Sequence, residues 1–129
     1  MALTKTARTI VAAATSNSAG GTTRGTLDLN SAQGGGTLTI KITNGGTGPT
    51  VQCLANVLIA HNGTLPTAAS AGSDWKTIAS VGGGTTASDI TEFSMQIAPS
   101  VMCLEVEFTG NTGQAVTVEA YLSELTTAS

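Results

Sequence analysis

Hydrophobic and polar residues alternate along much of this chain with a period of two. The clearest case is residues 37–43 (TLTIKIT), where Leu38, Ile40 and Ile42 alternate with threonines and one lysine. Residues 88–97 (SDITEFSMQI) and 101–109 (VMCLEVEFT) show the same period. Because a period of two puts alternate side chains on opposite faces, each segment is predicted to be a β-strand with one buried face.

Eight segments are predicted to be strands, and turn-forming residues separate them. They are residues 4–14, 22–29, 37–43, 50–60, 75–81, 88–97, 101–109 and 115–125. No segment shows good helical periodicity. We therefore expect an all-β fold, an antiparallel β-sandwich of about eight strands, with a jelly-roll among the topologies it allows. Residues 1–129 are expected to form a single domain, with flexible Gly/Ser/Thr-rich segments near 15–36 and 61–74.

A weak internal repeat relates two of these regions. Residues 38–58 (LTIKITNGGTGPTVQCLANVL) resemble residues 104–122 (LEVEFTGNTGQAVTVEAYL), with one residue of gap in the turn. Either any two hairpins with the same turn type look this alike, or two similar hairpins occupy equivalent places in a two-sheet sandwich. Both interpretations predict a β-hairpin at each position.

Charge is scarce in this chain and unevenly distributed. Only 10% of the residues are charged, against about 25% in an ordinary soluble domain. This composition fits either a surface that is polar but uncharged or one that neighbouring subunits cover. Residues 1–76 carry a net charge of +3, and residues 77–129 carry −6. The asymmetry favours head-to-tail contact between copies or docking on a charged partner, although chance explains it nearly as well.

The composition argues against several classes of function. A net charge of −3 and an aromatic share of 3% argue against nucleic-acid binding, which requires a basic face. No apolar run is long enough for a membrane span, and we expect no secretory signal. Cys53 and Cys103 stand alone, without a CxxC motif or a Cys/His cluster, so no metal or other cofactor is expected. Two buried free thiols are favoured over a disulfide.

The sequence offers no set of catalytic residues, and we expect that the chain is not an enzyme. His61 is the only histidine, and no GxSxG segment accompanies it. A Ser-His-Asp site is therefore not indicated. The glycine runs at 34–36 and 82–84 lack the Lys-Ser/Thr pair of a phosphate-binding loop and are predicted to be turns.

Three glutamates are candidates for contacts between subunits. If the last two predicted strands form a hairpin, Glu105 lies opposite Glu119, and Glu107 shares their outer face. Like charges directly opposite each other are unfavourable. A cation or a basic group from a neighbouring copy, such as Lys5 or Arg8, would then stabilise the cluster. The alternative is that these are solvated surface carboxylates.

The long loop at residues 61–74 (HNGTLPTAASAGSD) is a second candidate site, together with Trp75. A lone tryptophan after a long loop either provides a ligand platform, here beside His61, or anchors the loop on the core. We favour the anchor, because a buried tryptophan contributes a large apolar area. His61 is correspondingly expected to be a solvent-facing turn residue.

Four segments together resemble small β-sandwich virion proteins of tailed bacteriophages. They are residues 1–10 (MALTKTARTI), 38–51 (LTIKITNGGTGPTV), 61–80 (HNGTLPTAASAGSDWKTIAS) and 105–125 (EVEFTGNTGQAVTVEAYLSEL). The resemblance spans most of the chain and lies in pattern and composition. In many such proteins the loop before the tryptophan is shorter, whereas here about eleven residues separate the His61-Asn62-Gly63 turn from Trp75.

This resemblance implies a structural role in the virion and carries over no catalytic residue. It implies a capsid decoration (cement) protein, assembled in the host cytoplasm, that binds the major capsid protein or other virion proteins as a homo-oligomer. A head–tail connector or tail component is the alternative within the same class. A receptor- or carbohydrate-binding module, with His61 and Trp75 as its candidate site, is the alternative from a different class.

Overall fold

The computed structural model describes residues 3–31 and 35–128, which form eight strands. Each strand overlaps one of the eight predicted segments, so the predicted positions are confirmed. Their bounds are β1 Leu3–Asn17, β2 Thr22–Asp28, β3 Gly36–Asn44, β4 Leu54–Ala60, β5 Lys76–Gly82, β6 Ile90–Ile97, β7 Cys103–Thr109 and β8 Val116–Ala128. Residues 32–34, within the predicted flexible segment 15–36, lie outside the described residues.

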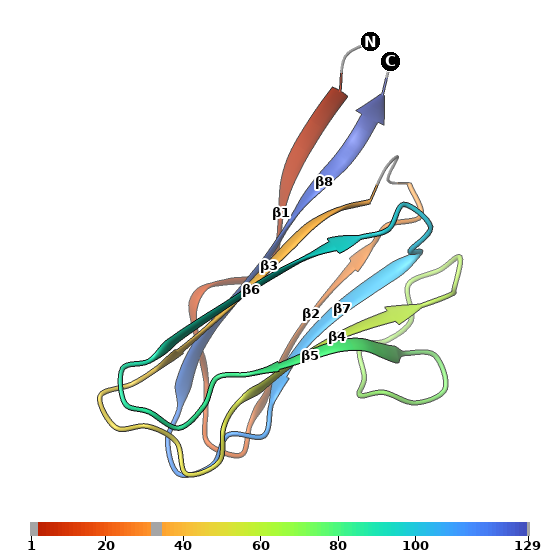
Figure 1. Cartoon of the computed structure of the whole chain (residues 1–129). Helices are drawn as coiled ribbons and strands as arrows, with labels where there is room; N and C mark the ends of the chain where they lie inside the picture. The colour runs from red at the N-terminus through yellow and green to blue at the C-terminus, as the bar shows by residue number, and fades with distance from the viewer. Residues whose placement is uncertain (1–2, 32–34, 129) are drawn as a thin grey trace.

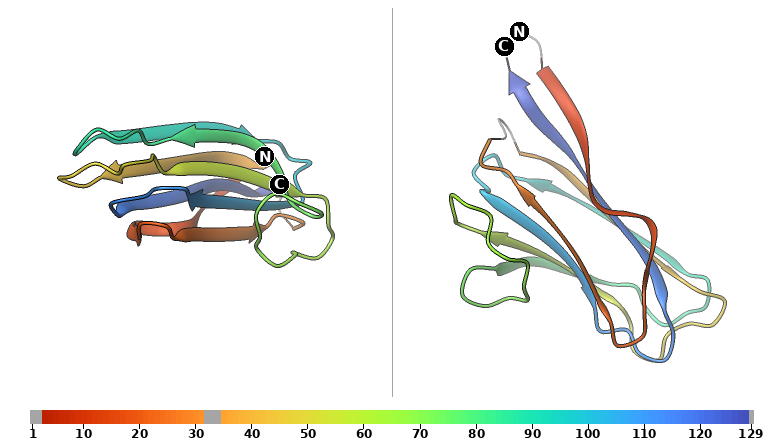
Figure 2. Two further views of the ribbon diagram at one scale, coloured as in Figure 1. Left: turned by 90° about the horizontal axis from the view of Figure 1, so that it is seen from below. Right: turned by 180° about the vertical axis from the view of Figure 1, so that it is seen from behind.

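The strands form two four-stranded antiparallel sheets that pack face to face (Figures 1 and 2). The first sheet has the order β1-β8-β3-β6, and the second has the order β2-β7-β4-β5. Successive strands alternate between the two sheets in β1–β4 and again in β5–β8, apart from the β4–β5 hairpin. This is the arrangement of an eight-stranded jelly-roll, and the predicted fold class is confirmed.

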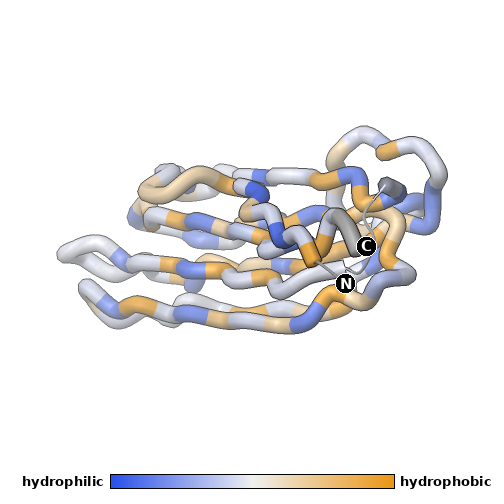
Figure 3. The backbone as a smooth tube through the Cα atoms, turned by 90° about the horizontal axis from the view of Figure 1, so that it is seen from above, coloured by the Kyte–Doolittle hydropathy of each residue, from blue (hydrophilic) through white to orange (hydrophobic). Residues whose placement is uncertain are grey.

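The core lies between the sheets and consists of small and medium-sized aliphatic side chains around one phenylalanine. Leu104, Val106 and Phe108 of β7 are fully buried and face Leu38 and Ile40 of β3 across the core. Each fully buried side chain of this kind contributes roughly 1.5–3 kcal/mol. Figure 3 shows the alternation of hydrophobic and hydrophilic positions along both layers.

The two segments of the internal repeat are not hairpins, and that prediction was wrong. β3 lies in the first sheet and β4 in the second, and β7 and β8 are separated in the same way. Both glycine-containing turns therefore carry the chain from one sheet to the other. The two connections pair with each other through an antiparallel bridge between Val51 and Thr112. The repeat covers β3 and β4 in its first copy and β7 and β8 in its second, and these are the central strands of the two sheets.

The two long sides of the sandwich differ. On the β1–β2 side the backbones approach so closely that a Cβ on Gly25 would lie 2.0 Å from the Ile10 carbonyl oxygen. On the β5–β6 side Phe93, Met95 and Val81 pack on the core but remain partly exposed. The sandwich is therefore closed along one side and open along the other.

β1 and β8 continue beyond the sandwich as a two-stranded ribbon (Figure 1). The pairing of β3 with β8 ends at Gly36 and Glu124, whereas β1 stays paired with β8 as far as Leu3 and Ala128. Within the sandwich, beyond the core residues Ile10 and Val11, a bulge at residues 12–14 makes an elbow in β1 (Figure 2), and Ala14 has a φ of 58°. The described residues contain no helix long and apolar enough to cross a membrane.

Candidate functional site

Two buried carboxylates lie on the outer face of the second sheet. Glu105 and Glu107 alternate with the inward-facing core residues of β7, so they point away from the core. Glu105 is 0% exposed and Glu107 is 4% exposed. Such groups need partners, because burying an unpaired charge is costly.

A polar row crosses all four strands of the second sheet and supplies partners for Glu107. Arg24 of β2 lies directly opposite Glu107, and its Nη1 donates to Glu107 Oε2. On the other side Asn56 Nδ2 of β4 donates to Glu107 Oε1 at 2.9 Å. Ser80 Oγ of β5 then donates to Asn56 Oδ1 at 2.6 Å. Each carboxylate oxygen of Glu107 is therefore hydrogen-bonded.

The loop between β4 and β5 folds back over these carboxylates. The Ala69 backbone N–H donates to Glu105 Oε1 at 2.9 Å, and Ser70 Oγ donates to Glu107 Oε2 at 3.0 Å. Arg24 Nη2 donates to Ser70 Oγ at 2.9 Å, which ties the same loop to β2. The loop, predicted as a flexible segment, is thus held against the sheet by polar contacts.

Trp75 fixes the other end of this loop. It is 2% exposed and packs with Leu58, Ala60 and Cys103 in a small second core beneath the loop. Its Nε1 donates to the Thr67 carbonyl oxygen at 2.9 Å. The prediction that Trp75 anchors the loop is confirmed, and its ring is not available as a ligand platform.

Glu105 is the less well satisfied of the two carboxylates. Among residues 3–31 and 35–128 its Oε2 has no hydrogen-bond partner, and Arg24 Nη1 lies 3.5 Å away. Burial raises the pKa of Glu105, and the neighbouring Glu107 raises it further, whereas the Ala69 N–H and Arg24 oppose that rise. The arrangement is a network of ion pairs and hydrogen bonds that holds the loop against the sheet.

The predicted pairing of Glu105 with Glu119 was wrong, because β7 and β8 belong to different sheets. Glu119 lies on the outer face of the first sheet, with its Oε1 3.9 Å from Lys41 Nζ. Glu105 and Glu107 do share one outer face, but Arg24 of the same chain lies beside them. The contact with a neighbouring copy is untested for these glutamates and stays a prediction.

Of the two candidate cations of β1, Lys5 lies on the projecting ribbon and Arg8 lies just inside the sandwich. Lys5 is exposed, and Arg8 Nη1 lies 2.6 Å from Oε2 of the buried Glu124. Sequence reasoning did not single out Arg24, Asn56 or Ser70. The outward positions of Arg24 and Asn56 on their strands could be read from the period of two, but Ser70 lies in the loop. The convergence of the three on Glu107 depends on the strand order and on the path of that loop.

His61 is exposed at the start of the loop, as predicted, and lies outside the polar network.

Both cysteines are free and buried, as favoured from the sequence. Cys103 pairs with Ala60 at one end of the β4–β7 ladder, and Cys53 precedes Leu54 at the other, which puts them roughly 20 Å apart. Burial raises the pKa of Cys53 to about 11. No group of three or more metal-ligating side chains occurs within residues 3–31 and 35–128.

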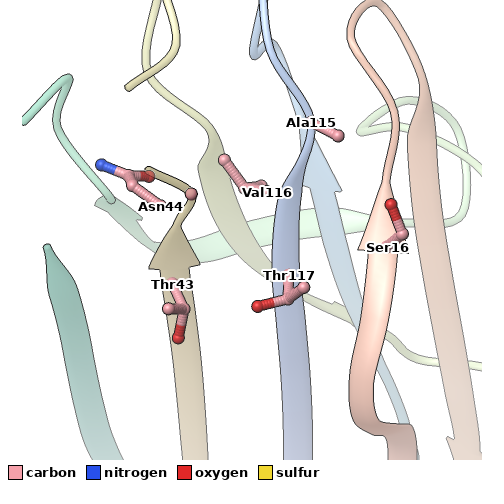
Figure 4. A pocket seen from close by; sticks show the side chains of 7 residues that line it. Ser16, Thr43, Asn44, Ala115, Val116 and Thr117 are labelled. Carbon is pink, nitrogen blue, oxygen red and sulfur yellow. The ribbon is translucent and has the colours of Figure 1, made fainter. Parts of the chain in front are cut away.

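A shallow pocket of about 200 Å³ lies at one end of the first sheet (Figure 4). Ser16, Thr117 and Thr43 lie side by side on β1, β8 and β3 and contribute three hydroxyl groups to it. No charged or aromatic residue lines it. The buried Asn44 Oδ1 lacks a partner, but it is shielded from solvent. The pocket therefore has little with which to recognise a ligand beyond weak hydroxyl contacts.

Comparison with known proteins identifies the fold class and no family. No family model matches the chain, and no curated protein sequence matches it. Among solved structures, the chain is similar to the K3 cleaved adhesin domain of Lys-gingipain from Porphyromonas gingivalis W83. The identity is 12% over 84% of this chain and 71% of that one, with a TM-score of 0.59. At this identity the likeness shows a shared β-sandwich fold and nothing further.

Two weaker structural similarities concern a phage-derived protein and a carbohydrate-binding module. The SPBc2 prophage-derived protein YomS matches with a TM-score of 0.46 and 14% identity over 95% of this chain and 96% of that one. The module TmCBM61, solved in complex with β-1,4-galactotriose, matches with a TM-score of 0.46 and 11% identity over 84% of this chain and 67% of that one. Neither similarity supports a conclusion about function.

Proposed function

We propose that this chain is a bacteriophage virion structural protein, specifically a capsid decoration (cement) protein, and not an enzyme. The observation that carries the proposal is the β1–β8 ribbon, which projects beyond the sandwich. An isolated two-stranded ribbon is only marginally stable in water. A ribbon that docks on another protein gains the contacts it lacks, and the major capsid protein of an assembled head is the partner we propose.

The surface chemistry supports an assembly role. Leu3 on the ribbon is 55% exposed, and elsewhere Val51 and Ile90 are 52% and 53% exposed. Because only 10% of the residues are charged, a partner can cover much of this surface with little desolvation cost. A protein that binds assembled shells better than free subunits stabilises the shell by mass action.

The decisive experiment mixes the purified protein with phage heads that lack it and pellets the heads. We expect saturable pelleting at a fixed ratio to the major capsid protein, with heads that resist heat or chelators better. Leu125→Asp changes a partly exposed ribbon residue whose strand partner is Lys5 of β1, and it should weaken head binding at least tenfold. Ile78→Asp, at a 43% exposed position on β5, is the matched control and should bind like the wild type.

Failure to pellet with heads would overturn the decoration role. Binding to purified tails or connectors instead would identify a connector or tail component. Binding to glycans or a host receptor would identify a recognition module. The pocket at Ser16, Thr43 and Thr117 would then be the first place to test, since Trp75 is buried.

A further inference from the structure

The first sheet has two edge strands, β1 and β6, whose directions are compatible with each other. In the order β1-β8-β3-β6 every neighbouring pair is antiparallel. β1 and β6 therefore run in opposite directions. A second copy placed beside the first in the same orientation would set its β1 antiparallel to β6, so the sheet could continue from copy to copy.

The unpaired backbone groups of these edges fall on matching positions. The Asn44 N–H donates to the Asp89 carbonyl oxygen, so in the antiparallel alternation Ile90, Glu92 and Ser94 direct their N–H and C=O groups away from β3. The Leu125 N–H donates to the Gly35 carbonyl oxygen, and the same alternation leaves Lys5 and Ala7 directing theirs away from β8. Both edges thus offer free donors and acceptors.

One register also pairs the charges. Lys5 and Arg8 are three residues apart on β1, and Glu92 of β6 is three residues from Asp89, which directly precedes that strand. In the antiparallel register that puts Lys5 opposite Glu92, Arg8 falls opposite Asp89. This register also joins Lys5 and Glu92 through their outward backbone groups. It keeps both of their side chains on the outer face of the sheet.

We infer that copies of this protein associate head to tail by pairing β1 of one copy with β6 of the next, with Lys5 opposite Glu92 and Arg8 opposite Asp89. The half-exposed Phe93 lies on the open β6 side, where it would fall opposite Thr4 of the added strand and be partly covered by it. Because the two surfaces differ, the contact is heterologous and leads to a ring or a filament according to its rotation. This inference deepens the proposed function, since it names the contact between copies on the shell.

Charge reversal tests the contact without disturbing the fold, because Lys5 and Glu92 are both exposed. Sedimentation velocity across a range of concentrations should show wild-type multimers that weaken in 1 M NaCl, where charges are screened. Lys5→Glu and Glu92→Lys should each associate at least tenfold more weakly when alone. An equimolar mixture of the two variants should co-assemble, because each then offers the other its complementary edge. The double variant should self-associate like the wild type.

Several results would overturn the inference. One is a wild type that stays monomeric at millimolar concentration. Another is normal association of Lys5→Glu and Glu92→Lys when each is alone. The charge of Lys5 would then only protect the edge strand β1 from unwanted pairing. A third is a mixture that fails to restore association. Ser94→Pro, which removes one outward N–H, should also abolish association, whereas Ser94→Ala should not.

Head binding is scored separately from self-association. Glu92→Lys leaves the β1–β8 ribbon intact, so it can still bind heads if only the contact between copies fails. Conversely, a wild type that multimerises but never pellets with heads would refute the decoration role and leave the edge pairing standing.

Discussion

Replacing Arg24 with methionine removes the guanidinium that lies between the Glu105 and Glu107 carboxylates. Methionine keeps an unbranched apolar stem in the same place. Taking one partner away from a buried ion pair costs about 3–5 kcal/mol, because it strands a buried charge. The Arg24 side chain is 26% exposed, so water replaces part of what is lost. We therefore expect a loss of about 3 kcal/mol, or about 12 °C in Tm.

The loss should depend on pH in a defined direction. The pKa of Glu105 is raised above 4.5, so the folded state holds this proton more tightly than the unfolded chain does. The corresponding stability is fully present below pH about 4.5 and declines as pH rises through the raised pKa. Removing Arg24 raises the pKa of Glu105 further. The free energy of unfolding of the variant should therefore lie far below that of the wild type at pH 8 and closer to it at pH 5.

Urea unfolding, followed by the fluorescence of the single, buried Trp75, measures the loss of stability and its dependence on pH. Lys41→Met is the control, since Lys41 and Glu119 are 37% and 24% exposed and their charges are 3.9 Å apart. It should cost less than about 1 kcal/mol. A loss below about 1 kcal/mol for Arg24→Met at pH 8, or an equal loss at pH 5 and pH 8, would refute the role assigned to the ion network.

Two substitutions and one labelling experiment test other parts of the structure. Gly25→Ala should destabilise the fold by more than about 2 kcal/mol in urea unfolding, because its Cβ would meet the Ile10 carbonyl oxygen at 2.0 Å. Trp75→Ala should cost about 3–5 kcal/mol and make residues 61–74 sensitive to limited proteolysis; an uncut loop would contradict its anchoring role. Cys53, buried and with a pKa raised to about 11, should not react with a thiol reagent at pH 8 until the protein unfolds.

The positions of the strands could be predicted from the sequence because a period of two is a local property. Segment 37–43 is almost identical to β3, and 22–29 is almost identical to β2. The prediction for β4 began four residues early, at residue 50 instead of Leu54, because Val51 pairs with the distant Thr112 and not within a strand ladder. The local sequence pattern does not distinguish a residue in an isolated bridge from one in a strand ladder.

The strand partners could not be predicted, and the candidate site depended on them. The turns after β3 and β7 contain the glycines typical of hairpins, yet both connect different sheets. The carboxylates of β7 were correctly placed on one outer face, but their cation was sought on Lys5 or Arg8. Arg24 became their neighbour only through the pairing of β2 with β7, which joins residues about 80 positions apart.

The place of β8 in the first sheet constrains when the protein can fold. β8 is the last strand to be synthesised, and it lies between β1, the first, and β3. Until it emerges from the ribosome, β1 has no neighbour in its sheet, and the buried face of β3 lacks the strand beside it. Native pairing in this half of the molecule must therefore wait until β8 has been synthesised, and strand pairing over such separations is slow. Until then the nascent chain has aliphatic strands uncovered, and chaperone binding would protect it during that period.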